Sequence, residues 1–382
     1  MDISMPNAQS PAPYSHWMLR EIHEQPSTLA QTLELYVDAN GFRDSSCAPI
    51  RSWLASVSGK IIIAASGSSR HAGLVAELSL EDTAGIAVDV EYASEYCCRT
   101  EKATPPAGVL IISQSGETAD TLAALRKAAQ VGHPTLAITN VANSTMAREA
   151  TVSFPTAAGV ERAVPATKSF TAQLLNLQLL TLLAAESQGT LDAATLQQRL
   201  HELAALPERI ARQLDGWEKN VRRIAAEYSR ASSFLFLGRG VHYAIAREGA
   251  LKLKESAYLH AEGYPSGELK HGPNALVSEG TPLVMIATVD RADGGSVLRY
   301  EKIVQLMRDM RAQGANILAV ANTGDRDVAE LASHFIEIDE APEAMLTISE
   351  VIPLKMLSYF MAINNGIDVD SPRNLTKAVL VE

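Results

Sequence analysis

The sequence predicts an α/β protein built from two tandem doubly wound domains, each a parallel sheet between two layers of helices. Short apolar runs, typical of buried parallel strands, alternate with segments of helical periodicity. The pattern occurs twice, because the first and second strand-like runs of the two halves are both offset by 173 residues (61 to 234 and 109 to 282). Apolar residues make up 47% of the 382 residues and aromatic residues only 5%. Such a composition of small aliphatic side chains suits helices packed on a sheet.

The first half supplies three strand signals and one clear helix. Ile61–Ala65 and Val109–Ile112 are continuous apolar runs, and each is followed by a cluster of serines. Thr118–Val131 has helical periodicity, and the apolar run Thr135–Thr139 comes after it. This alternation predicts strands buried on both faces and connected through helices.

The second half repeats the same plan. We expect strands at Phe234–Leu237 and Pro282–Ala287, a helix at Lys302–Gln313 and a further strand at Asn316–Val320. Two copies of a long unit indicate a duplicated doubly wound domain, since a solenoid needs several short repeats.

These signals divide the chain into five parts. We expect a helical arm over residues 1–50, a first domain over 51–192 and a helical linker over 193–223. A second domain over 224–366 and a C-terminal tail over 367–382 complete the prediction.

The charge of the chain argues against nucleic acid as a partner. The net charge is −11, whereas binding to a phosphate backbone requires clustered lysine and arginine. A small phosphorylated ligand remains compatible with this charge, because backbone N–H groups and hydroxyls can hold a phosphate.

The cysteines and the N-terminus indicate a cytoplasmic protein. Cys47, Cys97 and Cys98 are odd in number and include an adjacent pair, so they do not form a disulfide framework. The first residues lack an apolar core flanked by basic residues, and no apolar run reaches 18 residues. We therefore expect neither a leader nor a membrane anchor. The histidines include no metal-ligand spacing, so no metal and no cofactor are expected.

Hydroxyl-rich loops follow two of the predicted strands. Ser113–Thr118 and Ser66–Ser69 each lie between a buried strand and a helix, at the strand ends where doubly wound sheets bind ligands. Gly238–Gly240 occupies the same place in the second half. Serine and threonine are also favoured as helix caps, which is the ordinary explanation for a single loop of this kind. Two such loops at matching strand ends predict a site for a phosphate monoester.

The segment Glu248–Pro273 is the richest in candidate catalytic groups. Glu248, Lys252 and Glu255 are spaced to lie on one helix face, where a solvated Glu–Lys stripe is the simpler interpretation. A carboxylate held beside a lysine near a strand end could instead act as a general base. His271 follows in a loop bounded by glycine and proline and is a candidate acid or base.

The C-terminal tail contains a further candidate. Lys377 lies five residues from the end, where a lysine is usually a solvated charge. Val379, Leu380 and Val381 beside it indicate a docked tail. A docked and partly desolvated lysine can attack a carbonyl to form a Schiff base.

Four segments of the chain resemble the isomerase half of the glutamine–fructose-6-phosphate aminotransferase family. They are SQSGETADT, GRG, EGALKLKESAYLHAEGYPSGELKHGP and DVDSPRNLTKAV. The third is a specific block of 26 residues, and the similarity extends from about Leu19 to the end of the chain. The resemblance implies two sugar-isomerase (SIS) domains and a hexose or hexosamine 6-phosphate as ligand. It also implies a homodimer with shared active sites.

The resemblance assigns roles to particular residues. It implies that Glu255 moves a proton between C1 and C2, and that Lys377 forms the Schiff base with the open-chain ketose. Lys252 supports the proton transfers, and His271 assists ring opening in the site of the neighbouring subunit. It implies that the sugar phosphate is held by Ser69, Ser113, Gln114, Ser115, Thr118 and Val164.

The chain departs from the family pattern in two places. Ala166 stands where the family has a serine before Thr-Lys, which puts one ligand contact in doubt. The glutaminase half begins with a cysteine exposed by removal of Met, whereas Asp2 stands here, and nothing in the first 50 residues matches that half. We therefore expect that the chain does not make ammonia from glutamine.

Three functions are compatible with these observations. The first is a deaminase that converts glucosamine 6-phosphate, or its epimer, to fructose 6-phosphate and ammonia. The second is an isomerizing aminotransferase or a deglycase that takes ammonia from elsewhere. The third is a sugar-phosphate sensor without turnover, which the presence of Glu255, His271 and Lys377 disfavours.

Overall fold

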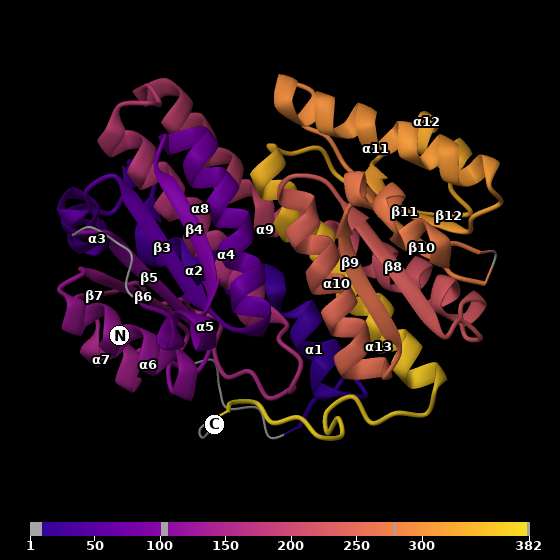
Figure 1. Cartoon of the computed structure of the whole chain (residues 1–382), viewed down its shortest axis with the longest axis horizontal. Helices are drawn as coiled ribbons and strands as arrows, with labels where there is room; N and C mark the ends of the chain where they lie inside the picture. Colours follow the sequence, from indigo (N-terminus) through magenta and orange to yellow (C-terminus); the bar gives the residue numbers. More distant parts are fainter. Residues whose placement is uncertain (1–9, 101–105, 279, 380–382) are drawn as a thin grey trace.

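The computed structural model describes residues 10–100, 106–278 and 280–379, and these form two α/β domains side by side (Figure 1). Each domain contains a five-stranded parallel sheet. The remaining two strands in the described ranges form a small antiparallel hairpin. Helices cover both faces of each sheet (Figure 1). The predicted fold class, two doubly wound three-layer domains, is confirmed.

The first sheet has the strand order β4-β3-β5-β6-β7. Its strands are β3 (Lys60–Ala65), β4 (Ala87–Tyr92), β5 (Gly108–Ser113), β6 (Thr135–Thr139) and β7 (Val152–Ser153). All six residues of β5 are buried, as expected for a continuous apolar run in a parallel sheet. Because β3 lies between β4 and β5, the winding reverses direction there. The carboxyl ends of β3 and β5 therefore form the switch point at which doubly wound sheets bind ligands.

The helices of the first half include an N-terminal arm whose second and third helices pack against the first domain and whose first helix packs against the second. The arm and its hairpin are α1 (Trp17–His23), α2 (Gln25–Tyr36), β1 (Val37–Asp38), β2 (Gly41–Phe42) and α3 (Asp44–Ser56). The domain itself contains α4 (Gly67–Ser79), the π-helix η1 (Leu80–Ala84), α5 (Ala93–Cys98), α6 (Ala119–Val131), α7 (Thr145–Glu149) and α8 (Lys168–Gln188). Helices α4 and α6 begin directly after the two strands of the switch point.

The second sheet repeats the order of the first as β9-β8-β10-β11-β12. Its strands are β8 (Ser233–Gly238), β9 (His260–Pro265), β10 (Leu283–Ala287), β11 (Ile317–Asn322) and β12 (His334–Ile338). Its helices are α10 (Val241–Ala257), the 3-10 helices η2 (Ser266–His271) and η3 (Pro273–Leu276), α11 (Gly294–Ala312), α12 (Arg326–Leu331) and α13 (Glu343–Asn364). The duplication predicted from the sequence is thus present in the topology.

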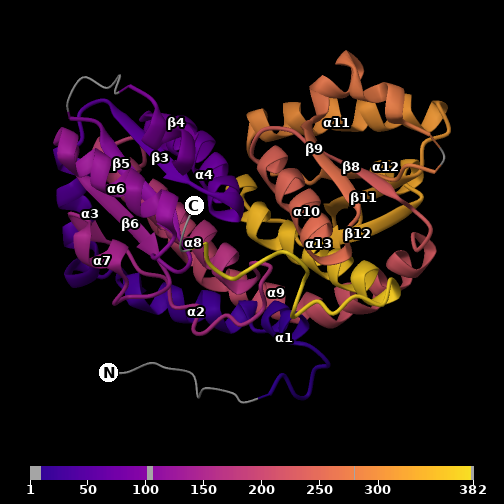
Figure 2. The same ribbon diagram turned by 60° about the horizontal axis from the view of Figure 1, so that its bottom comes forward.

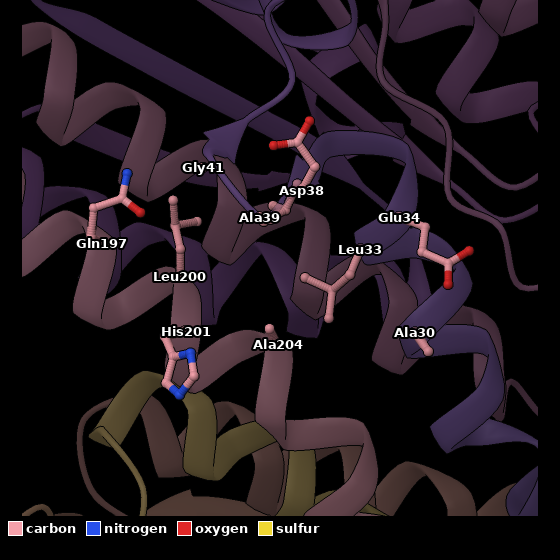
Figure 3. Close-up of a pocket in the computed structure, with 11 residues that line it drawn as sticks. Ala30, Leu33, Glu34, Asp38, Ala39, Gly41, Gln197, Leu200, His201 and Ala204 are labelled. Atoms are coloured by element: carbon pink, nitrogen blue, oxygen red, sulfur yellow. The ribbon is translucent and has the colours of Figure 1, made fainter.

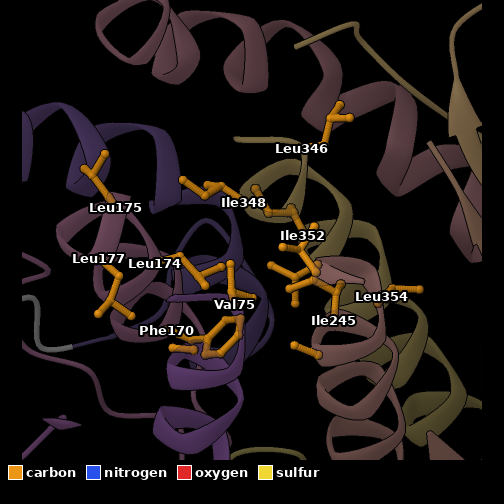
Figure 4. Close-up of a cluster of buried hydrophobic side chains, with 14 of the residues drawn as sticks. Val75, Phe170, Leu174, Leu175, Leu177, Ile245, Leu346, Ile348, Ile352 and Leu354 are labelled. Atoms are coloured by element: carbon orange, nitrogen blue, oxygen red, sulfur yellow. The ribbon is translucent and has the colours of Figure 1, made fainter. Parts of the chain in front are cut away.

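The two domains share one hydrophobic core. Its residues come from α4 and α8 of the first domain and from α10 and α13 of the second (Figure 4). Phe170, Ile245 and Ile352 are all fully buried in this cluster. The segment predicted as a linker lies within α9 (Ala193–Glu227), which packs against α2 and α13. Helix α13 is long and apolar enough to cross a membrane, but 94% of its most apolar window is buried, as in a core helix.

One local prediction is wrong, and one predicted helix is longer than expected. The segment around His271 was expected as a loop, but its backbone forms η2 and η3. Pro273, whose ring fixes φ near the helical value, is the first residue of η3. The helix expected around Lys302 to Gln313 is present as α11, which begins earlier, at Gly294. The side chain of Asp293 accepts hydrogen bonds from the amides of Gly295 and Ser296 and so caps a glycine-containing first turn.

The tail returns to the first domain. Figure 2 shows it, in yellow, running from the end of α13 across the front of both domains. The carboxylate of Asp370 accepts from the amides of Trp17 and Met18 at 2.8 and 3.0 Å. The carbonyl of Val379 accepts from the first amide of α6 at 3.1 Å. The tail is docked there through the backbone carbonyl of Val379, although the apolar side chain of Val379 is 54% exposed. Leu380 and Val381 lie outside the described residues.

Candidate functional site

A cavity of about 180 Å³ lies at the switch point of the first sheet. Its walls come from the loops after β3 and β5, from the loop before α8, from α10 of the second domain and from the tail. Nine of the ten site residues predicted from the sequence line it. They are Ser69, Ser113, Gln114, Ser115, Thr118, Val164, Lys252, Glu255 and Lys377.

The loop after β5 presents three hydroxyls to this cavity. Ser113 Oγ accepts from the amide of Gly116 at 3.1 Å, and Ser115 Oγ accepts from the amide of Glu117 at 3.2 Å. Thr118 Oγ1 lies 3.5 Å from both serine hydroxyls. Thr118 is the N-cap of α6, yet within the described chain its side chain makes no capping bond. These hydroxyl hydrogens can therefore be donated to an anion at the positive end of α6.

The loop after β3 is built in the same way. Ser66 is the N-cap of α4 and, within the described ranges, its hydroxyl makes no capping bond either. Ser69 lies in the first turn of α4 and is 9% exposed. Two helix N-termini thus point toward one small polar cavity, which is the arrangement expected for a phosphate.

Gly116, in the loop Ser113–Thr118, has a backbone conformation and surroundings that only glycine fits. Its φ is +65°, and a Cβ atom there would lie 2.2 Å from Ser144 Oγ. We expect Gly116→Ala to lower the free energy of unfolding by about 2–4 kcal/mol, through backbone strain and overpacking. Gly132→Ala is the matched control, since its φ is +93° but nothing lies within 4 Å of the added carbon. Urea unfolding measures both variants, and an equal cost for the two would contradict the clash.

The acidic and basic groups of α10 form a buried cluster that joins the domains. Lys252 Nζ pairs with Glu255 and lies 3.5 Å from Glu248 Oε1. Glu248 Oε2 is 2.8 Å from Nδ1 of His71 on α4. Burial alone would raise the pKa of Glu248, but the charge of Lys252 and the hydrogen bond from His71 lower it to about 2. Lys252 is 1% exposed and its pKa is raised, because the two carboxylates outweigh burial, so it is a fixed ammonium.

Glu255 is the accessible member of this cluster. Its side chain is 22% exposed and lines the cavity, whereas Glu248 is fully buried and does not. Lys252 thus orients a carboxylate toward a space in which a small molecule fits. A carboxylate placed in this way can accept a proton from a bound ligand.

Lys377 brings an amine to the same cavity from the tail. Its Nζ donates to the carbonyl of Ala163 at 2.7 Å and pairs with the carboxylate of Glu161. The side chain remains 26% exposed. An amine held in this way can reach a carbonyl group of a ligand in the cavity.

Two acidic residues that support the site were missed from the sequence. Glu161 lies in the loop before α8, and Glu21 on α1 accepts from Thr167 Oγ1 at 3.0 Å and from the amide of Ala163 at 3.3 Å. Burial and the neighbouring charge of Glu161 raise the pKa of Glu21 to about 7. The sequence carries no signal for either residue, because both act through contacts that join distant segments.

His271 lies apart from this cavity. It ends η2 in the second domain, is exposed, and does not contribute to the cavity wall of its own chain. Its neighbour Lys270 pairs with Asp309 on α11. The role assigned to His271 thus remains a prediction that depends on a second subunit.

The second domain has a cavity at the corresponding position. Its volume is about 310 Å³, and Ser79 and Asp82 line it. The 173-residue repeat places these two residues where Lys252 and Glu255 stand in the first cavity. The second domain thus has a cavity at the equivalent position, but Ser79 and Asp82 stand there in place of the lysine and the glutamate of the first one.

Beside this second cavity, two carboxylates of the chain pair with a buried histidine. His242 takes the place of Ser69 in the repeat, and it lies 2.9 Å from Glu350 and 3.3 Å from Glu343. Arg299 Nε donates to Glu343 at 2.8 Å. Burial alone would lower the pKa of His242, but the charges of Glu350 and Glu343 raise it to about 10. Since this cation is already paired, we place the phosphate position on the first domain.

A third hollow lies between α2, the β1–β2 hairpin and α9 (Figure 3). Its volume is about 370 Å³, and its walls carry Glu34, Asp38 and His201 among apolar side chains. It contains neither a hydroxyl loop nor a lysine in the described part of the chain. Its groups do not match the chemistry of the switch-point cavity, although it is larger.

Fold and site together define an enzyme of the sugar-phosphate isomerase type. The SIS domain family profile matches residues 54–183 and 227–365, and the chain belongs to this family. It corresponds to the C-terminal, isomerase half of glutamine–fructose-6-phosphate aminotransferases.

The similar proteins are of several kinds. The chain is 42% identical over 370 residues to the glutamine–fructose-6-phosphate aminotransferase of Pseudomonas putida and 43% identical over 373 residues to that of Bordetella parapertussis. The matches cover 97% of this chain but only 59% of those relatives. The C-terminal domain of the Francisella tularensis enzyme superposes with a TM-score of 0.88, at 35% identity over 95% of this chain and all of that one. A glucosamine-6-phosphate deaminase of Thermotoga maritima has a TM-score of 0.72 at 23% identity, with 95% and 99% coverage, and shows the shared fold alone.

Proposed function

We propose that this chain converts glucosamine 6-phosphate, or its galacto epimer, to fructose 6-phosphate and ammonia. The observation that carries the proposal is that Lys377 and Glu255 face one cavity whose floor is the hydroxyl loop after β5. An amine, a carboxylate and a phosphate cradle are the three groups that such a reaction requires.

The hydroxyl loops would hold the phosphate end of the sugar. Ser113, Ser115, Thr118 and Ser69 supply hydroxyl donors, and Gln114 also lines the cavity. The N-terminal ends of α4 and α6 supply positive dipoles, so no lysine or arginine is needed for the phosphate. Val164 would contact the carbon chain from the loop before α8, where Ala166 lacks the hydroxyl that the family pattern has.

Glu255 would move the proton between C1 and C2 of the open-chain sugar. Removing the proton from C2 of the amino aldehyde and returning it at C1 leaves an imine at C2. Lys252, a buried ammonium in contact with Glu255, would hold that carboxylate directed at the sugar.

Lys377 would release the nitrogen. Its amine attacks C2 of the imine, the C2–N bond to the original nitrogen breaks, and ammonia leaves. Water then hydrolyses the C2–Lys377 iminium to give fructose 6-phosphate and the free lysine. The atoms balance without a redox cofactor.

We further propose a homodimer in which His271 is supplied to the neighbouring site. The exposed position of His271, outside the cavity of its own chain, supports this arrangement. His271 would assist ring opening, which must precede proton transfer.

A second candidate function is the reverse reaction, synthesis of the amino sugar with external ammonia. It is favoured by the names of the relatives at 42–43% identity, which are isomerizing aminotransferases. Near neutral pH an alkyl amine with a pKa of about 10 is almost entirely protonated, and ammonia behaves similarly. The nucleophilic form is therefore scarce, and synthesis would require high ammonium.

The purified chain is expected to release ammonia and fructose 6-phosphate in equal amounts from glucosamine 6-phosphate, without glutamine. An enzyme-coupled ammonia assay over glucosamine, galactosamine and N-acetylglucosamine 6-phosphates measures this. Added glutamine is expected to change neither the rate of deamination nor the rate of synthesis. Glutamine-dependent synthesis by this chain would overturn the proposal, and tight sugar-phosphate binding without turnover would indicate a sensor.

A further inference from the structure

Glu161 is a buried carboxylate with a set of donors directed at it. Its side chain is fully buried, and it accepts from the amide and hydroxyl of Thr167 at 2.9 and 3.0 Å. It also accepts from the amide and hydroxyl of Ser169 at 2.9 and 2.7 Å. Thr167 is the N-cap of α8 and Ser169 lies in its first turn, and the positive end of this helix favours an anion there. The fifth donor is the ammonium of Lys377.

Glu161 can affect the cavity only indirectly. It is not part of the cavity wall, whereas its partner Lys377 is. Burial alone would raise the pKa of Glu161, but the charge of Lys377 and the hydrogen bonds from Ser169 lower it to about 2. It is therefore ionised at neutral pH. Removing a cation from a buried carboxylate is costly, since the remaining charge has no counter-ion.

The tail places Lys377 by few other contacts. Arg373 N donates to Tyr258 Oη at 2.6 Å, and the Val379 carbonyl accepts from the first amide of α6. The amine itself contacts two acceptors among the described residues, Glu161 and the carbonyl of Ala163. Both acceptors lie in the loop before α8, next to Val164 in the cavity wall.

We infer that Glu161 is a positioning residue for Schiff-base formation, holding the Lys377 nitrogen at the cavity and serving as counter-ion to the iminium. This inference rests on the proposed function. In sum, the lysine ammonium and the C2 carbonyl of fructose 6-phosphate give a C2 iminium and one water. The C=O bond is replaced by a C=N bond, and the nitrogen carries one positive charge before and after. To attack C2, the Lys377 ammonium must first give up a proton, which ends on the departing water. Glu161 therefore faces a cation in the starting ammonium and again in the product iminium.

The test compares Glu161→Gln, Glu161→Asp and Ser169→Ala with the unchanged chain. Ser169→Ala is the matched control, because it removes one hydrogen bond to the same carboxylate but leaves the charge beside Lys377. Borohydride trapping with fructose 6-phosphate, read by mass spectrometry, measures the rate of adduct formation. Calorimetry measures sugar-phosphate binding, and thermal unfolding reports on the fold.

Glu161→Gln is expected to slow trapping by about 10- to 100-fold, the effect of losing one hydrogen bond between charged groups. Binding of fructose 6-phosphate should change by less than about threefold, since Glu161 does not line the cavity. Glu161→Asp should restore part of the trapping rate, and Ser169→Ala should leave that rate near the unchanged value.

Four outcomes are decisive. Unchanged trapping by Glu161→Gln overturns the inference, and so does an equal loss in Glu161→Gln and Ser169→Ala, which would indicate a structural role only. If Glu161→Gln does not fold, Glu161→Asp provides the test, because this variant keeps the charge but moves it away from Lys377 by one methylene. Unchanged trapping by Glu161→Asp would then overturn the inference. Absence of any adduct in the unchanged chain would instead overturn the proposed function on which the inference rests.

Discussion

Replacing Lys377 with alanine is expected to abolish the adduct that borohydride traps with fructose 6-phosphate. Both lysines are paired with carboxylates, but the Lys377 side chain is 26% exposed and lines the cavity, whereas Lys252 is 1% exposed and held between two carboxylates. Lys377 is therefore the more accessible nucleophile. Mass spectrometry of the reduced protein should show the added mass of the sugar phosphate on the unchanged chain and none on Lys377→Ala.

The control for this experiment is Lys254→Ala. Lys254 belongs to the same helix as Lys252 but is exposed and does not line the cavity, so its removal should leave the adduct intact. An adduct that persists without Lys377 would show that the Schiff-base assignment is wrong. Peptide mapping would then identify the lysine that carries the sugar.

Replacing Glu255 with glutamine is expected to lower turnover by about 100- to 10,000-fold, the usual contribution of a general base. The amide keeps the shape of the side chain but cannot accept a proton. Sugar-phosphate binding should remain, because the hydroxyl loops after β3 and β5 are unchanged. Ammonia release measures turnover, and calorimetry measures binding.

A second readout separates proton transfer from Schiff-base formation. Glu255→Gln should still form the trappable adduct with fructose 6-phosphate, since Lys377 is intact. Glu262→Gln is the control, because Glu262 lies on β9 outside the cavity. Turnover by Glu255→Gln within a few-fold of the unchanged chain would exclude Glu255 as the base.

The strands that were predicted from the sequence are more deeply buried than the strands that were missed. The runs at β3, β5, β6, β8, β10 and β11 were found because they are buried on both faces and read as continuous apolar segments. Four strands at the sheet edges, β4, β7, β9 and β12, were missed. They carry charged or polar residues or are very short, as β7 with its two residues Val152–Ser153 illustrates.

The long apolar helices were also difficult to predict. Helices α8 and α13 are buried on nearly all sides, so their apolar residues do not form a stripe of helical period. Their packing across the domain boundary gives the chain one shared core (Figure 4).

The sequence by itself determined the duplicated doubly wound architecture and the positions of the hydroxyl loops. Both follow from local patterns, namely apolar runs and the residues directly after them. It also identified Lys252, Glu255 and Lys377 individually. Only the tertiary structure decided that α10 and the tail meet the loop after β5, and that His271 lies elsewhere. It alone revealed that Glu161 pairs with Lys377, and that Glu343 pairs with His242 and Arg299 in the second domain. The physical reason is that ion pairs depend on distance in space, and residues 161 and 377 are brought together only when the whole chain folds.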